Sequence, residues 1–189
     1  MKVKQVAVFA SGNGSNAENI IKYFKANPQI SIALIASNNP LAKVLKRAQQ
    51  HRVSTLLFNT EELQNGCVLK ELKQKRIDFI VLAGFLLKIP QSIINQFVKK
   101  IINIHPSLLP LYGGKGMYGI RVHQKVFEAQ EKETGITIHF VNESYDDGAV
   151  IFQAKCPLYK NIKLKAIQKK VHELELKFLP RIIENLLNG

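Results

Sequence analysis

The sequence predicts an α/β fold: a single domain built on a doubly wound, mostly parallel sheet, with antiparallel additions in the C-terminal half. The chain has 189 residues, of which 46% are hydrophobic, and this suits one globular domain with a sizeable core. In the first hundred residues, short apolar segments alternate with helical ones. The apolar segments carry few polar residues, as strands do when helices cover both faces of a parallel sheet.

The N-terminal elements follow from this alternation. The first strand is expected at 6–10, and the helix after it has an apolar face made by Ala17, Ile20, Ile21 and Phe24, with Ser15 as a candidate cap. Further strands are expected at 30–37, 53–58, 78–85 and 100–105. Helices are expected from Pro40 through a stripe of Leu41, Val44, Leu45 and Ala48, at 60–76 with a weak point at Gly66, and within 90–100.

The C-terminal half has a different pattern. Residues 106–120 form a long loop rich in glycine and proline, and loops of that length are usually functional or mobile. A helix is expected at 121–132, then a half-exposed strand at 135–141 and another strand at 150–158. In this pair Ile136, Ile138 and Val150 should face inward, with His139 opposite Ile138. The tail from Lys163 is helical, and Pro180 should bend or interrupt it.

Composition narrows the function classes. The net charge of +13 comes from lysines spread along the chain, which favours a solvated surface that attracts anionic ligands, although a basic nucleic-acid-binding module stays open as an alternative. No apolar run reaches the roughly 18 residues of a membrane span, and no secretory signal is seen. Cys67 and Cys156 fit inert thiols in a reducing cytoplasm, and no cluster of metal ligands is apparent.

The segment SGNGSN, residues 11–16, joins the first strand to the first helix. It reads G-x-G-x-x-N, so it lacks the third glycine of the dinucleotide fingerprint and the end of a P-loop. It still offers backbone N–H groups, a serine hydroxyl and a helix N-terminus, which suit one phosphate monoester. A plain strand-to-helix turn that uses glycine for positive φ is an equally good interpretation of this segment alone.

The segments NIHP and DDGAVI carry the remaining chemistry. Asn103 and His105 project to one side of an extended strand, while Ile102 and Ile104 enter the core on the other side. An amide can donate to an oxyanion, and histidine carries protons near neutral pH. The alternatives are a satisfied polar pair at a strand end and, for Asp146 and its neighbour, simple turn formers.

At this point the residues resemble a known family. SGNGSN, VLAGF, NIHPSLLP, ITIHFVN and D-x-G-x-V-I-x-Q occur in the order and at the spacings of the folate-dependent formyltransferases. SGNGSN narrows the resemblance to the purine-pathway family of glycinamide ribonucleotide transformylases (phosphoribosylglycinamide formyltransferases), and GGKGMYGIRVH looks like one loop variant found there. The resemblance covers nearly the whole chain. It implies a Rossmann-like formyltransferase fold and a cis Leu109–Pro110 peptide.

The resemblance also implies a function. A metal-independent one-carbon transferase of purine biosynthesis would move the formyl group of 10-formyltetrahydrofolate to the amine of glycinamide ribonucleotide, through a tetrahedral intermediate. Residues 1–189 would form one formyltransferase domain, with about 1–100 on the ribonucleotide-phosphate side and about 101–189 on the catalytic and folate side. The partners would be these two small molecules, without nucleic acid or membrane, in a cytoplasmic monomer or homodimer.

Site residues are carried over by matched position. The implied catalytic set is Asn103, His105 and Asp146, with His139 as a support for the Asp146 loop. The implied ribonucleotide site comprises Gly12, Asn13, Gly14, Ser15 and Asn16 at the phosphate, and His172, Glu173, Leu174 and Glu175 at the glycinamide end. The implied folate site comprises Leu86, Leu87, Lys88, Ile89, Asn142, Glu143, Ser144, Tyr145 and Asp146. Residues 58–66 lack the folate-contacting arginine of some relatives, which leaves lysines such as Lys88 for the folate carboxylates.

Two related enzymes are runners-up. A methionyl-tRNA formyltransferase would need a second, RNA-binding domain, for which 189 residues leave no room. A formyltetrahydrofolate hydrolase usually carries an N-terminal regulatory domain. A nucleic-acid-binding module would show steep salt dependence and would leave NIHP and DDG unexplained.

Overall fold

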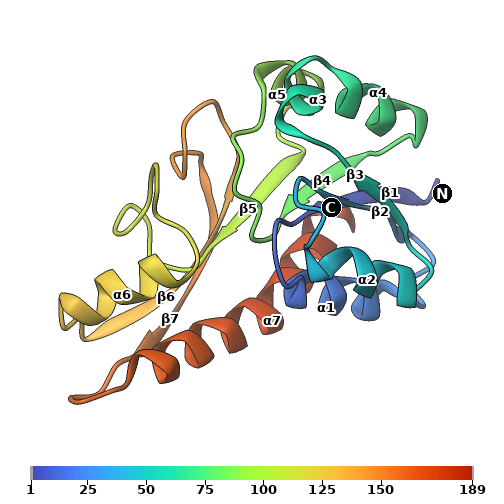
Figure 1. Ribbon diagram of the computed structural model, residues 1–189. Coiled ribbons are helices and arrows are strands. Elements are labelled where there is room, and N and C mark those ends of the chain that lie inside the picture. Colours follow the sequence, from blue (N-terminus) through green and yellow to red (C-terminus); the bar gives the residue numbers. More distant parts are fainter. Residues whose placement is uncertain (1, 189) are drawn as a thin grey trace.

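The computed structural model describes residues 2–188 as one seven-stranded sheet with helices on both faces (Figure 1). The strands are β1 (Lys4–Phe9), β2 (Ile30–Ser37), β3 (Ser54–Leu57), β4 (Phe79–Leu82), β5 (Ile101–His105), β6 (Glu133–Phe140) and β7 (Val150–Pro157). The helices are α1 (Ser15–Phe24), α2 (Lys43–Gln50), α3 (Thr60–Gln64), α4 (Cys67–Gln74), α5 (Gln91–Gln96), α6 (Ile120–Glu128) and α7 (Leu164–Asn188).

The sheet order is β3-β2-β1-β4-β5-β6-β7. The first five strands pair in parallel, and β6 and β7 pair antiparallel. The chain starts near the middle of the sheet, builds outward to β3, and then crosses back to build in the other direction from β4. This confirms the predicted α/β class, with its doubly wound, mostly parallel sheet and antiparallel C-terminal additions.

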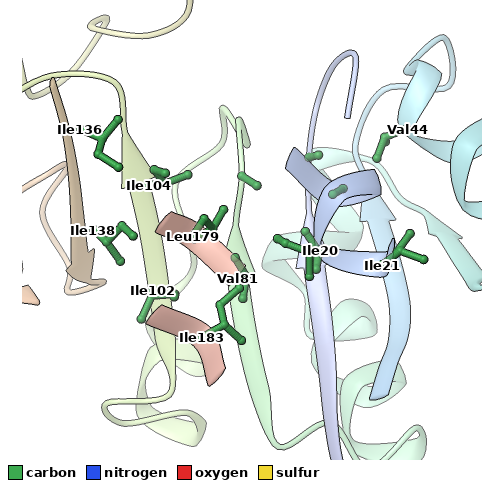
Figure 2. Packing of buried hydrophobic residues seen from close by; sticks show 14 of the residues in the cluster. Ile20, Ile21, Val44, Val81, Ile102, Ile104, Ile136, Ile138, Leu179 and Ile183 are labelled. Atoms are coloured by element: carbon green, nitrogen blue, oxygen red, sulfur yellow. The ribbon is translucent and has the colours of Figure 1, made fainter. Parts of the chain in front are cut away.

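Two apolar cores lie on opposite faces of this sheet. In β1, Val6 and Val8 join the core under α1, α2 and α7, whereas Ala7 and Phe9 join the core under α3, α4 and α5. Successive strand residues point to opposite faces, so a strand covered on both sides must be apolar at every position. Figure 2 shows the α7 side, where side chains from that helix pack over isoleucines of β5 and β6.

Two local predictions were wrong, and a third was confirmed in part, since the helical stretch 60–76 does have its weak point at Gly66. Ser15 does not cap α1: it is the first helical residue, and the cap position is Gly14 in a left-handed conformation, φ 76°, with no side-chain cap bond. Pro40 precedes α2 rather than starting it, because the Asn39 side chain accepts a hydrogen bond from the Leu41 N–H at 3.0 Å and forms a turn, which leaves Leu41 87% exposed. The helical stretch 60–76 is two helices, since Gly66 turns the chain at φ 93°.

Two further corrections concern the C-terminal half. Pro180 does not interrupt α7, which continues from Leu164 to Asn188 because Pro180 and its neighbour Leu179 are buried in the core. The strand β6 is not half-exposed: six of its eight residues are buried, because α7 packs against one face while the 107–109 turn and the turn carrying Asp146 cover the other. Val150 does not face inward and is 54% exposed, because it begins the edge strand β7.

Among residues 2–188, no helix is both long enough and apolar enough to cross a bilayer.

Candidate active site

A cavity of about 1080 Å³ lies beyond the carboxyl ends of β1, β4 and β5. Parallel sheets of this kind bind ligands at that edge, where the strand order reverses. Six segments and His123 of α6 contribute to its walls; the segments are 11–16, 82–89, 103–106, 114–120, parts of 139–146, and parts of 168–175. Its size is enough for a nucleotide and a second small molecule.

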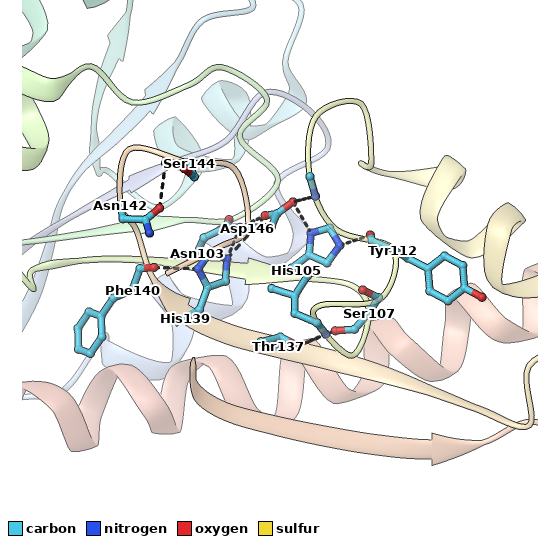
Figure 3. Close-up of polar contacts among 12 residues, drawn as sticks. Asn103, His105, Ser107, Tyr112, Thr137, His139, Phe140, Asn142, Ser144 and Asp146 are labelled. Carbon is cyan, nitrogen blue, oxygen red and sulfur yellow. Dashed lines mark hydrogen bonds and ion pairs between the residues drawn. The ribbon is translucent and has the colours of Figure 1, made fainter. Parts of the chain in front are cut away.

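Asn103, His105 and Asp146 line this cavity and form one cluster of polar contacts (Figure 3). The His105 side chain is buried, and its Nδ1 lies 3.4 Å from Asp146 Oδ2. The Asn103 amide donates from Nδ2 to Asp146 Oδ1 at 3.3 Å. The strand β5 holds Asn103 and His105 on one side, as predicted, while the turn after β6 brings in Asp146.

Asp146 is held as a carboxylate by its surroundings. Burial alone would raise the pKa of Asp146, but the hydrogen bond from His105, the charge of His105 and the Gly114 N–H outweigh burial and hold that pKa well below its usual range. The Gly114 bond is 3.0 Å long. The cluster therefore presents a negative charge to the imidazole of His105.

The His105 ring is fixed from both sides. Its Nε2 donates to the Tyr112 carbonyl at 2.8 Å and its Nδ1 faces Asp146, so each ring nitrogen faces an oxygen atom. Tyr112 adopts a left-handed φ of 57°, and its hydroxyl donates to Glu131 at 2.6 Å. That hydrogen bond, together with burial, raises the pKa of Tyr112 to about 12.

His139 is buried, with 2% of its surface exposed, and the prediction that it sits on an exposed strand face was wrong. Its Nδ1 donates to the Phe140 carbonyl at 2.8 Å, which leaves Nε2 to accept from Asn103 Nδ2 at 3.1 Å. The turn after β6 folds back over this side of the strand, because Gly148 packs so closely that an added Cβ would lie 1.7 Å from the Phe140 oxygen. His139 thus contacts the cluster of Asn103, His105 and Asp146 and does not face solvent.

A hydrogen-bonded network supports the turn after β5. The Thr137 hydroxyl donates to the Ser107 carbonyl at 2.7 Å and accepts from the Leu109 N–H at 3.0 Å. The Gln153 amide bridges the same hydroxyl and the Leu109 carbonyl, at 2.9 and 3.0 Å. The Leu109–Pro110 peptide is cis, as predicted.

The loop 11–16 lines the same cavity at the end of β1, two strands away from β5 and the Asn103 and His105 side chains. Ser11 anchors it: the Ser11 N–H donates to the Gly84 carbonyl at 2.9 Å, and its hydroxyl accepts from the Leu86 N–H at 3.1 Å. Gly14 packs against α2, where an added Cβ would lie 2.4 Å from Val44. Glycine is therefore required here by both its φ and its neighbour, and the N-terminus of α1 opens toward the cavity.

The helix α7 meets this loop through Glu175. Its Oε2 accepts from Asn16 Nδ2 at 3.0 Å and from His172 Nδ1 at 2.9 Å. The hydrogen bond to Glu175 raises the pKa of His172 despite partial burial. His172 and Glu175 line the cavity, but Glu173 is exposed beside Lys169, and Leu174 packs against the core.

The predicted folate residues gather around the same cavity. Seven residues line it in addition to Asp146: Leu86, Leu87, Lys88, Ile89, Asn142, Ser144 and Tyr145. Glu143 lies instead on a neighbouring cavity of about 450 Å³, which shares Lys88, Ile89 and Ser144 with the first. The geometry therefore brings together all the predicted site residues except Glu143, Glu173 and Leu174.

Two buried polar atoms in the cavity wall have no partner among the described residues: Asn16 Oδ1 and His123 Nδ1. Buried polar atoms are rarely left unpaired, so each marks a point where a bound molecule can supply the missing partner. Burial lowers the pKa of His123 and favours its neutral ring. The sequence offered one signal for His123, a histidine within the apolar stripe of a helix, and it was not singled out.

Within residues 2–188, no three His, Cys, Asp or Glu side chains are grouped so as to bind one metal ion.

Comparisons with known proteins agree on one family. The chain matches the family described as "Formyl transferase" over residues 4–183. It is 36% identical over 191 residues to a phosphoribosylglycinamide formyltransferase of Bacillus subtilis (strain 168), covering 98% of this chain and 95% of that protein. It is 34% identical to a trifunctional purine biosynthetic protein adenosine-3 of Drosophila melanogaster, covering 98% of this chain but 14% of that protein.

A solved structure agrees as well. The crystal structure of a phosphoribosylglycinamide formyltransferase from Anaplasma phagocytophilum superposes with a TM-score of 0.91 at 29% identity, covering 100% of this chain and 88% of the other.

Proposed function

The chain belongs to the formyl transferase family, and from this premise we propose that it transfers the formyl group of 10-formyltetrahydrofolate to the amine of glycinamide ribonucleotide, a step of purine biosynthesis. One observation carries the proposal. A single cavity is lined both by a loop suited to a phosphate monoester and by the Asn103, His105 and Asp146 cluster. An acceptor with a phosphate and a nucleophilic amine fits both features.

The amine of the acceptor attacks the formyl carbon, and a C–N bond forms while the carbonyl oxygen becomes an oxyanion. Asn103 and His105 are the proposed donors to that oxyanion, and each good donor contributes on the order of 3 kcal/mol. Both now bond to Asp146 over long distances, 3.3 and 3.4 Å. Catalytic hydrogen bonds are often long in unliganded sites and tighten in the complex, so the N–H groups of Asn103 and His105 can be shared between Asp146 and the formyl oxygen.

The proton balance assigns a role to Asp146. The attacking nitrogen loses a proton, and the folate nitrogen gains one when its bond to the formyl carbon breaks. Asp146 keeps His105 charged and oriented, and we assign it to pass the proton between the two nitrogens, directly or through water. His139 and the Tyr112 carbonyl hold the two ends of this arrangement in place.

The remaining assignments are part of the same proposal. Residues 12–16, His172 and Glu175 bind the ribonucleotide, while 86–89 and 142–146 bind the folate, with Lys88 near its carboxylates. Residues 1–189 act as one domain, about 1–100 serving the phosphate and about 101–189 the chemistry and folate. The two small molecules are its partners, and its free cysteines suit the reducing cytoplasm.

Steady-state kinetics test the proposal, with transfer followed at the folate absorbance. Glycinamide ribonucleotide should be the efficient acceptor. Glycinamide riboside, which lacks the phosphate, should react with a much higher KM, and initiator methionyl-tRNA should not react. Release of formate without any acceptor would instead indicate a hydrolase, and a preference for the tRNA would overturn the assignment of the acceptor.

A further inference from the structure

The outer side of the 11–16 loop is held by α2. The Val44 N–H donates to the Gly12 carbonyl at 3.2 Å, and Arg47 Nε donates to the Asn13 carbonyl at 2.9 Å. Arg47 Nη2 also donates to the Asn13 side-chain oxygen at 3.2 Å. Two consecutive carbonyls of the loop are therefore drawn toward one helix.

The direction of these carbonyls sets the direction of the N–H groups. In a trans peptide the C=O and the following N–H point to opposite sides. Because the Gly12 and Asn13 carbonyls face α2, the N–H groups of Asn13 and Gly14 point away from it, and neither has a protein partner among residues 2–188. Free N–H groups on a loop that lines the cavity are the donors that a phosphate needs.

Arg47 is itself fixed by Glu18 of α1. Its Nη1 forms a short ion pair with Glu18 Oε2, and the other carboxylate oxygen contacts Lys22 at 2.9 Å and His51 at 3.3 Å. The Glu18 side chain is 18% exposed, so this cluster is partly shielded from water. Each of the three guanidinium nitrogens of Arg47 thus donates to the loop or to Glu18, and Arg47 is not among the residues that line the cavity.

We propose that Arg47 is a positioning residue for the ribonucleotide phosphate: it holds the Asn13 carbonyl from behind the loop, which aims the N–H groups at the phosphate, and Glu18 holds Arg47 in that place. This inference rests on the proposed function, since it takes the loop as the phosphate site. Arg47 acts through backbone geometry and not as a cation on the ligand.

The variants Arg47→Lys and Lys46→Ala distinguish the positioning of the loop by Arg47 from the effect of positive charge on α2. Lysine keeps the charge but cannot donate at once to both Asn13 oxygens and Glu18. We expect Arg47→Lys to raise the KM for glycinamide ribonucleotide about tenfold, as the loss of a charge-assisted hydrogen bond would, with the KM for the folate unchanged. Lys46→Ala removes one exposed charge from the same helix and should leave both KM values within about twofold.

The direction in which Glu18→Gln changes the KM for the ribonucleotide distinguishes the two possible roles of Arg47. If Arg47 positions the loop, loosening it should raise the ribonucleotide KM, by about threefold. If Arg47 instead attracts the phosphate by its charge, removing a neighbouring negative charge should lower that KM. A lowered KM in Glu18→Gln, a wild-type KM in Arg47→Lys, or equal effects of Arg47→Lys and Lys46→Ala would each overturn the inference.

A second readout separates this inference from the proposed function. Inorganic phosphate should raise the Tm of the wild-type protein and of Lys46→Ala, and should raise that of Arg47→Lys much less. If the wild type stabilises with phosphate but transfers no formyl group, the proposed function fails and the phosphate comparison still decides the role of Arg47. Equal phosphate stabilisation in all three proteins would overturn that role.

Discussion

Asp146→Asn is the substitution that most directly removes the electrostatic part of the cluster. Asparagine keeps the shape of the side chain but carries one oxygen and one NH2 group. Three donors contact the carboxylate: Gly114 N–H at 3.0 Å and His105 Nδ1 at 3.4 Å on one oxygen, and Asn103 Nδ2 at 3.3 Å on the other. The NH2 group of the new asparagine must therefore face hydrogen-bond donors, with which it cannot pair.

The expected loss follows from these contacts. A hydrogen bond to a charged group contributes about 1.5–3 kcal/mol, so losing the one to His105 and its charge should lower kcat by a factor on the order of 100 or more. Both KM values should change much less, because the interaction strengthens in the transition state. His105→Ala combined with Asp146→Asn should be scarcely slower than the slower single variant, since the two residues act as a unit.

Steady-state and single-turnover kinetics at the folate absorbance measure this loss. Asp147→Asn is the matched control: Asp147 is the next residue in the same turn, is exposed and accepts a hydrogen bond from Asn142 at 3.3 Å, and its substitution should keep near wild-type kcat. A near-normal kcat in Asp146→Asn, or losses that add fully in the double variant, would refute the reasoning and reduce Asp146 to a turn residue.

Three further predictions concern the supports of the site. Gly14→Val should raise the KM for the ribonucleotide and spare that for the folate, because its Cβ would lie 2.4 Å from Val44; equal losses for both substrates would contradict the phosphate assignment. Hydrogen bonds from Lys22 and His51 outweigh burial and, with Arg47, lower the pKa of Glu18 to about 2, below its value near 4.5 in the unfolded chain. The ionised Glu18 therefore stabilises the fold fully above pH 4.5, and this stabilisation is lost as the pH falls toward 2. The free energy of unfolding, measured from pH 7 to 2, should thus fall less in Glu18→Gln than in wild type or in the exposed control Glu61→Gln. Identical pH dependence in all three proteins would exclude the effect. Thr137→Val leaves the groups around that hydroxyl unpaired, which costs about 1–3 kcal/mol and should lower the Tm by several degrees in calorimetry; an unchanged Tm would show that the network is dispensable.

The parts of this molecule that the sequence predicts well are those that local periodicity encodes. The central strands β1 and β4 contain continuous apolar runs because both of their faces are covered, so their positions were visible in the pattern. Asn103 and His105 were also visible, since the two-residue period of a strand separates them from Ile102 and Ile104.

Long-range packing accounts for the rest. The burial of His139 depends on a turn that folds back over its strand. The orientation of the His105 ring depends on a hydrogen bond to the Tyr112 carbonyl, a backbone group that no side-chain pattern reveals. Arg47 looks like an ordinary surface charge until α2 is placed behind the loop at residue 13. The cap of α1 was missed for a similar reason, because Gly14 adopts its conformation where the loop packs against Val44.

The most direct test of the account follows a ¹³C-labelled formyl group from 10-formyltetrahydrofolate by NMR, in the presence of glycinamide ribonucleotide and purified protein. The account predicts that the label appears on the glycinamide nitrogen in amounts equal to the tetrahydrofolate released, and that Asn103→Ala and His105→Ala slow its appearance by at least about a hundredfold. Label recovered as formate, or transfer that proceeds undiminished without Asn103 and His105, would contradict it.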